Sequence, residues 1–238
     1  MTTHLDKKIA DTLLLLEKAV REYSPVTFAN SLGAEDMVLT DLISKYQPNI
    51  DMFSLDTGRL PQETYALMHT VRTLYAVPLV VYSPDAGDLE IYVAEHGVNG
   101  FYESVQNRKS CCHVRKVRPL RRALVGAGGW ITGMRREQAV TREQLEAIGY
   151  DTDNGLWKFN PLLDWSSDDV WSYIKTNNVP YNKLHDEFYP SIGCAPCTRA
   201  VTAGEDVRAG RWWWEDPQYK ECGLHVGKSV LPIISQLA

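Results

Sequence analysis

The chain has 238 residues, of which 44% are hydrophobic and 23% charged, and its formal net charge is −5. This composition excludes a disordered chain, and the length is enough to bury a substantial core within one domain. The negative charge argues against nucleic acid as a partner, and the longest aliphatic run, Leu13–Leu16, is too short to span a bilayer, so we expect no membrane association.

The first two thirds of the chain alternate between helical and strand-like segments. Apolar residues recur at helical spacing from Leu5 to Val20, and Val26–Ser31 is typical of a buried strand followed by a glycine-containing loop. The next predicted elements, in chain order, are a helix carrying residues 37–43, a strand at Ile50–Leu55, a helix beginning near Pro61, a strand at Leu79–Tyr82, a helix over about 114–125, a strand at Gly129–Gly133 and a helix within Asn160–Asn177 that Ser166 or Ser167 caps.

This alternation predicts an α/β fold with a mainly parallel sheet and helices on both faces. After about Tyr181 the pattern becomes irregular and contains three consecutive tryptophans, Trp212–Trp214, which we expect to anchor a core or an interface. In sheets of this type, ligands bind beyond the carboxyl ends of the strands.

Three polar segments follow predicted strands and are expected to converge on one crevice, namely 31–36 (Ser-Leu-Gly-Ala-Glu-Asp), 56–59 (Asp-Thr-Gly-Arg) and 133–136 (Gly-Met-Arg-Arg). Gly33 permits close approach of the backbone, and the N–H groups that begin the next helix suit an anion. Side chains suited to a nucleotide phosphate are Thr57, Arg59, Arg135 and Arg136. The first loop matches neither the dinucleotide-binding glycine pattern nor a P-loop, so an ordinary strand–helix turn is the alternative interpretation.

Residues 108–122 carry seven Lys or Arg side chains and no acid. Most such runs form a solvated helix face, and a nucleic-acid contact is disfavoured because no aromatic residue interleaves the run. Cys111 and Cys112 lie inside it, which favours a third interpretation, in which positive charge holds an anionic small molecule or a metal–thiolate centre nearby.

The five cysteines are Cys111, Cys112, Cys194, Cys197 and Cys222. An odd count, and a charged N-terminus without the apolar segment of a signal peptide, argue against a secreted disulfide scaffold and predict a reducing, cytoplasmic location. The Cys111–Cys112 pair and the Cys194-Ala-Pro-Cys197 motif together suit tetrahedral zinc or an iron–sulfur cluster. Adjacent cysteines are unusual for structural zinc, but the spacing does not choose between the metals.

Cys222 stands outside this set of four and lies in the segment Glu221-Cys-Gly-Leu-His225. Its polar and small neighbours favour an exposed thiol that acts as a nucleophile, and His225 can polarise it or bind an anion. The alternative is a small buried residue, which is the commoner state of a free cysteine.

Six segments together resemble the assimilatory adenylyl-sulfate and phosphoadenylyl-sulfate reductases, and they follow that family's order over about residues 26–228. The segments are 31–36, 55–60, Cys111–Cys112, 133–138, Cys194-Ala-Pro-Cys197 and Glu221-Cys-Gly-Leu-His225. The resemblance implies a Rossmann-like fold of the adenine-nucleotide alpha-hydrolase (PP-loop) type. It also implies a single reductase domain over residues 1–238, with an irregular C-terminal segment from about residue 200 that carries Cys222.

In this family the four-cysteine set accompanies a [4Fe–4S] cluster and adenylyl sulfate (APS) as substrate, whereas members that use the 3′-phosphorylated nucleotide (PAPS) usually lack it. The resemblance therefore implies one cluster per chain and thioredoxin-dependent reduction of APS to sulfite and AMP, through an S-sulfonate on Cys222. The thioredoxin-like domain of the plant enzymes is missing, so an external thioredoxin or glutaredoxin-like reductant is implied. A homo-oligomer is left open.

By the same resemblance, the phosphosulfate contacts are assigned to Lys116, Arg208, Arg211 and His225, and the nucleotide contacts to Leu55, Thr57, Gly133 and Arg142. The loops after the strands add Ser31, Gly33, Ala34, Arg135 and Arg136 as substrate-binding candidates. Three other functions stay open: a PAPS reductase that releases adenosine 3′,5′-bisphosphate, an ATP-dependent PP-loop enzyme, and a zinc module that contacts nucleic acid. The Ser-Gly-Gly-x-Asp-Ser loop expected of the second is absent.

Overall fold

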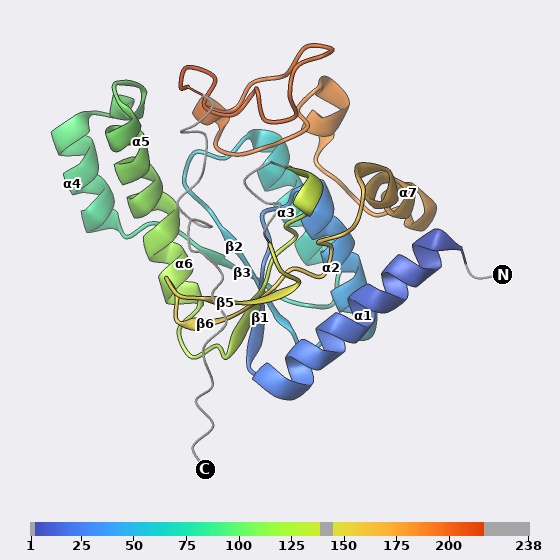
Figure 1. Cartoon of the computed structure of the whole chain (residues 1–238). Helices are drawn as coiled ribbons and strands as arrows, with labels where there is room; N and C mark the ends of the chain where they lie inside the picture. The colour runs from blue at the N-terminus through green and yellow to red at the C-terminus, as the bar shows by residue number, and fades with distance from the viewer. Residues whose placement is uncertain (1–2, 139–144, 217–238) are drawn as a thin grey trace.

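A computed structural model of the chain describes residues 3–138 and 145–216 (Figure 1). The α-helices are α1 (His4–Tyr23), α2 (Ala34–Tyr46), α3 (Gln62–Leu74), α4 (Ala86–His96), α5 (Val105–Cys112), α6 (Arg118–Ala123) and α7 (Ser167–Asn177). The strands are β1 (Val26–Ala29), β2 (Asp51–Leu55), β3 (Leu79–Tyr82), β4 (Gly129–Ile131), β5 (Ile148–Asp151) and β6 (Leu156–Phe159). Arg142, Cys222 and His225 lie outside the described residues, so what the sequence predicts for them stays a prediction.

The six strands form one sheet in the order β3-β2-β1-β4-β6-β5. Neighbouring strands are parallel except β5 and β6, which form an antiparallel hairpin at one edge. In the centre, Phe28 of β1 is in register with Met52 of β2 and Ile131 of β4. The predicted α/β architecture with a mainly parallel sheet is confirmed.

Helices cover both faces of this sheet. Figure 1 shows α4, α5 and α6 on one side of the molecule and α1 and α7 on the other. Phe28, Met52 and Ile131 belong to the main core with residues of α1, α2, α3 and α7. Their neighbours Phe53 and Trp130 point to the opposite face, where they pack with α6, because successive side chains of a strand alternate between faces.

Side chains cap the starts of α1, α4, α5 and α7, whereas the start of α2, which matters for the site, has no such cap. The Ser166 hydroxyl accepts the Asp169 N–H and the Asp169 carboxylate accepts the Ser166 N–H, so the predicted serine cap of α7 is confirmed as a capping box. The N-cap of α2 is Gly33, which makes no side-chain hydrogen bond. The N–H groups of its first turn therefore need another acceptor.

The basic run is helical over a longer stretch than the sequence predicts, because α5, a π-helix (His113–Val117) and α6 follow one another without a gap. The start at Val105 escaped prediction because the face that α5 buries is built from Arg108, Cys111 and Cys112 rather than from large apolar residues. Helix α4 and the β5–β6 hairpin also escaped prediction; the four-residue strands of the hairpin contain the buried polar residues Asp151 and Lys158.

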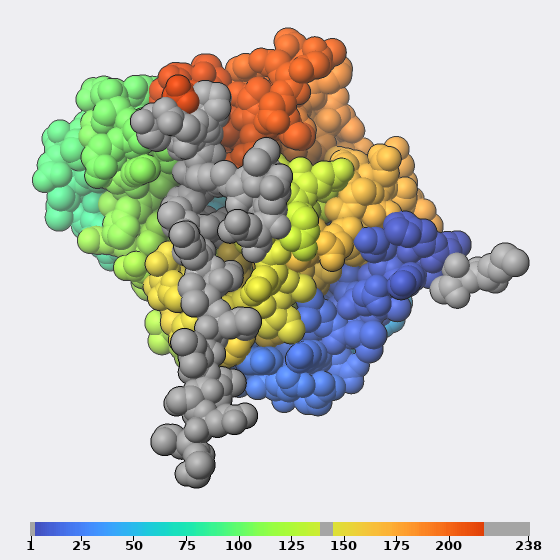
Figure 2. Space-filling model, in the orientation of Figure 1, coloured from blue at the N-terminus to red at the C-terminus, as the bar shows by residue number. Residues whose placement is uncertain are grey.

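After Tyr181 the described chain contains short 3₁₀ turns, Lys183–Glu187 and Ala195–Cys197, and an isolated bridge between Thr198 and Arg211, as the irregular pattern predicts. Two more 3₁₀ turns lie at Gly100–Tyr102 and Arg136–Gln138. Figures 1 and 2 show residues 181–216, in orange and red, as a cap at one end of the molecule. Within the described ranges, no helix has both the length and the apolar character needed to cross a membrane.

Candidate active site

A cavity of about 500 Å³ lies where β1 meets β4, the point at which the strand order reverses. Open α/β sheets bind their ligands at such a point, beyond the carboxyl ends of the strands. Much of the apolar lining comes from the strands and from α6, through Ala29, Phe53, Leu55, Leu120 and Trp130. The remaining lining is mostly polar and comes from the loops after β1 and β4 and from the cap.

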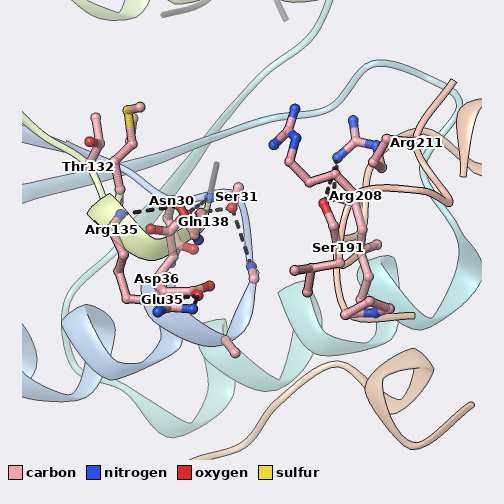
Figure 3. A pocket seen from close by; sticks show the side chains of 18 of the residues that line it. Asn30, Ser31, Glu35, Asp36, Thr132, Arg135, Gln138, Ser191, Arg208 and Arg211 are labelled. Carbon is pink, nitrogen blue, oxygen red and sulfur yellow. Dashed lines mark hydrogen bonds and ion pairs between the residues drawn. The ribbon is translucent and has the colours of Figure 1, made fainter. Parts of the chain in front are cut away.

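The two polar walls of this cavity face each other (Figure 3). The loop after β1 and the first turn of α2 bring Asn30, Ser31 and Asp36 to one wall, and the cap brings Arg208 and Arg211 to the other. Segments 31–36 and 133–136 thus meet at one cavity, as the sequence predicts, whereas no residue of the third predicted segment, 56–59, is among those that line it.

Asp36 joins the loop after β1 to the loop after β4. Its carboxylate accepts the Ser31 N–H at 2.7 Å, the Ser31 hydroxyl and the Gly133 N–H. Residue 133 has to be glycine in this arrangement because a Cβ there would overlap the Asp36 carboxylate. Burial raises the pKa of Asp36 to about 6, and the hydrogen bonds from Ser31 and Gly133 only partly oppose that rise.

The two arginines after β4 are engaged by acidic neighbours. Arg135 lines the cavity, but its guanidinium pairs with Glu35 at 2.9 Å and with Glu137 at 2.8 Å. Arg136 does not line the cavity and pairs with Asp164 at 3.2 Å. The positive charge that the sequence places after β4 is therefore largely neutralised by the protein itself.

Besides Arg135, which is paired with two acids, three cations line the cavity: Lys116, Arg208 and Arg211. The Nη1 atom of Arg211 donates to Ser191 Oγ at 3.3 Å, and its guanidinium lies 4.7 Å from the centre of the Trp212 ring. Gly193 makes room for this group, because a Cβ at residue 193 would lie against the Arg211 guanidinium. These cations make this part of the cavity attractive to an anionic ligand.

The four cysteines predicted as metal ligands line a second, smaller cavity: Cys111, Cys112, Cys194 and Cys197. Helix α5 supplies the adjacent pair, and the 3₁₀ turn of the cap supplies the other two. Backbone hydrogen bonds hold that turn, from the Ala195 N–H to the Arg59 carbonyl at 2.8 Å and from the Trp212 N–H to the Cys197 carbonyl at 3.1 Å. The fold thus brings together two pairs that are far apart in the sequence.

Side chains of neighbouring elements hydrogen-bond to these sulfurs. Thr57 Oγ1, after β2, lies 3.2 Å from Cys194 Sγ. The Arg115 side chain hydrogen-bonds to Cys111, and its Nη1 also donates to the Thr57 carbonyl at 2.7 Å. Such contacts around a metal-binding thiolate fix its orientation and tune the metal it holds.

The pKa values of the thiols reflect a buried site in which positive charge opposes desolvation. Burial and the neighbouring Cys194 raise the pKa of Cys197 to about 12, against the opposite effect of Lys116 and Arg211. Burial also raises the pKa of Cys111, while Arg115 lowers it. Without a metal, Cys111 and Cys197 are therefore neutral thiols at pH 7, whereas a bound metal would hold them as thiolates.

The residues around the smaller cavity fit an iron–sulfur cluster. Five cations line the same cavity as the thiols: Arg59, Arg108, Arg115, Lys116 and Arg211. Arg115 Nε is buried without a hydrogen-bond partner among the described residues, so an anionic centre beside it would satisfy an orphaned donor. Within 3–138 and 145–216, no three His, Cys, Asp or Glu side chains lie close enough to hold a single ion, whereas four thiolates around a four-iron cluster are spread more widely.

The two cavities share a wall made by Lys116, Arg211 and Trp212. Trp212 is buried between them, with only 1% of its surface exposed, whereas Trp213 is 39% exposed. Trp213 and Trp214 pack edge-to-face against Tyr102. A ligand in the larger cavity therefore meets the same cations that face the four thiols.

Nine of the predicted substrate-binding residues line the larger cavity: Ser31, Gly33, Ala34, Leu55, Lys116, Gly133, Arg135, Arg208 and Arg211. Thr57 lies beside Cys194 instead, and Arg136 is turned towards Asp164. Their roles with substrate stay predictions, as do those of Arg142, Cys222 and His225.

Sequence reasoning did not single out Arg108 and Arg115, although both lie within the basic run. The signal was their spacing: Arg108 precedes Cys112 by four residues, and Arg115 follows Cys111 by four, so each pair shares a helix face. The aromatic lining, Phe53 and Trp130, carried no comparable signal because any buried strand contains such residues.

Residues 25–200 of the chain match the family model of the phosphoadenosine phosphosulfate reductase domain. A protein of Allochromatium vinosum named adenosine 5′-phosphosulfate reductase is 53% identical over 94% of this chain and 88% of its own length. A protein of the same name from Burkholderia cepacia is 50% identical over 98% of this chain and 93% of its own length.

Solved structures show the same relationship at the level of the fold. A phosphoadenylyl-sulfate (PAPS) reductase from Candida auris, in a phosphate complex, has a TM-score of 0.69 and 30% identity and covers 83% of this chain and 96% of its own. A Candida glabrata FMN adenylyltransferase with FMN and an ATP analogue has a TM-score of 0.58 at 15% identity, covering 91% of this chain and 77% of its own. The predicted Rossmann-like fold of the nucleotide-binding PP-loop type is confirmed.

Proposed function

Because the chain belongs to the phosphoadenosine phosphosulfate reductase family, we propose that it is an enzyme of sulfate assimilation that reduces APS to sulfite and AMP. The relatives at about half identity carry the name of that activity. In the structure, the observation that supports the proposal is the wall of Lys116, Arg211 and Trp212 that the nucleotide-sized cavity shares with the four-thiol cavity. An anionic substrate that reacts beside a metal–thiolate centre needs such a shared wall.

In this proposal APS occupies the larger cavity, whose volume is that of a small-molecule site. The apolar lining around Phe53 and Trp130 suits the nucleoside, and the first-turn N–H groups of α2 behind Gly33 suit a phosphate oxygen. Lys116, Arg208 and Arg211 offset the charge of the phosphosulfate.

The chemical step that we assign to Cys222 is a group transfer. Its thiolate attacks the sulfur of APS, the bond between that sulfur and the phosphate oxygen breaks, and AMP leaves while an S-sulfonate forms on Cys222. The attacking group and the substrate are both anionic, so the fixed cations Lys116 and Arg211 lower their mutual repulsion.

The second half-reaction takes two electrons from a dithiol protein of the thioredoxin or glutaredoxin class. One of its thiolates attacks Cys222 Sγ, sulfite leaves, and a mixed disulfide forms. The second thiol of the reductant resolves it, which restores Cys222, leaves the reductant as a disulfide and releases the two thiol protons. Free thiols are needed throughout, so we place the reaction in a reducing compartment, the cytoplasm.

Cys111, Cys112, Cys194 and Cys197 are the residues that we propose hold one [4Fe–4S] cluster. When bound, the cluster supplies a fixed charge distribution and joins helix α5 to the cap. The chain's own residues perform the rest of the chemistry: Lys116 and Arg211 orient the substrate, and Cys222 carries the sulfo group.

A second candidate is reduction of PAPS, the nucleotide named for the Candida auris relative, which is 30% identical to this chain. The two candidates differ in the phosphate on the 3′ oxygen of the ribose. Comparing kcat/KM for APS and PAPS, with the same thioredoxin, separates them. We expect a strong preference for APS; a preference for PAPS would overturn that choice while keeping the family chemistry.

The decisive experiment traps the sulfo group. Protein purified without oxygen is analysed for iron and acid-labile sulfide, mixed with one equivalent of APS without reductant, and digested for mass spectrometry. We expect about four irons and four sulfides per chain, release of AMP, and one sulfo group on the peptide that contains Cys222. Thioredoxin should then release it as sulfite.

Cys222→Ser is the matched variant, because it removes the proposed nucleophile and leaves the four ligands in place. It should retain iron and bind APS without releasing AMP. A sulfo group on any other cysteine would contradict the proposal, as would zinc in place of iron. Conversion of ATP to AMP and pyrophosphate would indicate the ATP-dependent alternative.

A further inference from the structure

Arg108 and Glu215 form a buried ion pair between helix α5 and the last part of the cap that the structure describes. Arg108 Nε lies 3.0 Å from Glu215 Oε1, and Arg108 Nη2 lies 2.8 Å from Glu215 Oε2. The exposed fractions of the two side chains are 0% and 3%. Two parallel hydrogen bonds of this kind fix direction as well as distance.

The same guanidinium reaches the metal site. Arg108 precedes Cys112 by one helical turn, and its side chain hydrogen-bonds to the Cys112 sulfur. Its Cζ atom also lies 4.6 Å from the centre of the Trp212 ring, and the Glu215 N–H donates to the Trp212 carbonyl at 2.9 Å. One buried cation therefore connects a proposed cluster ligand, the wall that both cavities share, and Glu215.

Glu215 stands seven residues before Cys222 in the sequence. Seven residues of extended chain span at most about 25 Å, so the position of Glu215 fixes the centre of the volume that the Cys222 thiol can reach. The local concentration of a tethered group depends strongly on where its tether begins. Displacement of Glu215 would therefore change how often the thiol meets the substrate.

A need for stability does not explain this ion pair. Burying two charges costs more than burying apolar side chains of the same size, and such pairs are often replaced without loss of stability. Orientation explains the pair better. The planar guanidinium of Arg108 offers separate donors to the Glu215 carboxylate and to the Cys112 sulfur, so it holds the end of the cap in one orientation against a proposed metal ligand.

We propose that Arg108 and Glu215 are positioning residues that couple the four-cysteine site to the segment carrying Cys222. With the cysteines assembled around a metal, Arg108 is held between the Cys112 sulfur and the Glu215 carboxylate, and the start of the C-terminal segment is fixed. Linkage makes the coupling reciprocal, so loss of the Glu215 carboxylate weakens retention of the metal. The inference rests on the proposed function for the part that concerns Cys222.

Glu215→Gln tests the coupling because it keeps the shape of the side chain and removes its charge. The chain offers a matched control in Glu205→Gln: Glu205 makes an equivalent two-point pair with Arg199, at 2.8 and 2.9 Å, in the same cap, and both side chains of that pair are partly exposed. Arg108→Lys keeps the positive charge but cannot bond to both partners in the geometry of a guanidinium.

Two readouts are compared with wild type and with Glu205→Gln. The first is the rate at which a chelator removes iron, measured without substrate. The second is the single-turnover rate of S-sulfonate formation at saturating APS, normalised to bound iron, with the Kd of APS measured separately. We expect Glu215→Gln to lose iron several-fold faster and to form the S-sulfonate about tenfold more slowly or worse, with the Kd of APS nearly unchanged.

The proposal would be overturned if Glu215→Gln and Glu205→Gln lost iron at the same rate, or formed the S-sulfonate at the same rate. A higher Kd with a normal single-turnover rate would also overturn it, because that pattern indicates a substrate contact. Should Glu215→Gln fail to fold, Arg108→Lys takes its place, and failure of both to fold would show a merely structural pair. If wild type forms no S-sulfonate, the proposed function has failed, and the iron-release comparison still decides the coupling.

Discussion

The carboxylate of Asp36 occupies the space that a side chain at residue 133 would need. Asp36 comes from the first turn of α2 and Gly133 from the loop after β4, so this contact joins the two loops that border the larger cavity. The Gly133 N–H and the Ser31 N–H both donate to the same carboxylate. The width of the cavity at this edge thus depends on one acidic side chain and one missing methyl group.

Gly133→Ala should therefore weaken nucleotide binding. A Cβ there forces Asp36 and the two loops apart, and we expect the Kd of APS or AMP to rise about tenfold or more, since small displacements of positioning groups have large effects. Isothermal titration calorimetry measures this directly. Gly87→Ala in α4 is the control, because its Cβ would meet only Asp85 Oδ1 at 3.4 Å, and it should leave binding unchanged. Equal affinity for the two variants would contradict the prediction.

The raised pKa of Asp36 predicts a specific pH dependence of stability. Burial moves its pKa from 3.8 to about 6 in the folded protein, so between these values the folded chain holds a proton that the unfolded chain has lost. Stability therefore falls as pH rises from about 4 to about 6, by on the order of 3 kcal/mol from this group.

Asp36→Asn should remove that contribution. Urea unfolding of the wild type and of Asp36→Asn, at about pH 4.5 and at about pH 7, gives the free energy of unfolding of each protein. We expect the wild type to lose stability relative to Asp36→Asn as the pH rises. Asp51→Asn, at an exposed position of β2, is the control. Parallel pH profiles for the wild type and Asp36→Asn would show that Asp36 is not the titrating group.

Lys116 borders both cavities, so its removal should affect activity far more than folding. For Lys116→Ala we expect kcat/KM for APS to fall about a hundredfold, the usual cost of losing one fixed group that stabilises developing charge. Lys109→Ala removes an exposed lysine of the preceding turns and should behave like the wild type. Steady-state sulfite release and melting curves together test the prediction, and unchanged kinetics would remove Lys116 from the site.

The family resemblance implies that Thr57 contacts the nucleotide, whereas the structure places its hydroxyl beside a cysteine sulfur. Its hydroxyl lies against Cys194 Sγ, so Thr57→Val, which keeps the shape, should speed loss of iron to a chelator by about tenfold while the Kd of APS stays the same. Thr64→Val, whose hydroxyl accepts from Asn182 away from the sulfurs, is the control. A raised Kd with normal iron retention would support the nucleotide contact that the family resemblance implies.

Strands β1, β2 and β3 could be predicted to within about two residues, because each is a short apolar run that ends at a turn. The β5–β6 hairpin could not, since Asp151 and Lys158 interrupt its pattern and its burial depends on tertiary contacts. The serine cap of α7 was predictable because its capping box is local chemistry.

At the site, residue types were easier to predict than their partners. The residue type and the motifs of Cys111 and Cys194 predict metal ligands, and in the structure both cysteines line the smaller cavity. That Arg136 turns to Asp164, however, depends on contacts between segments 28 residues apart, which no local pattern reveals. The pairing of Arg108 could not be predicted for the same reason, because its partner Glu215 lies 107 residues away.

The cap contributes two of the four thiols and α5 the other two, and Cys112 and Cys194 are 82 residues apart. During synthesis, α5 leaves the ribosome long before the second pair exists, so the proposed metal site is complete only once Cys197, about four fifths of the way along the chain, has emerged. If the four cysteines hold a cluster as proposed, an oxidant that removes its iron would also remove the link between α5 and the cap. Resistance of residues 181–216 to a protease should thus report, in cells, whether maturation has been completed.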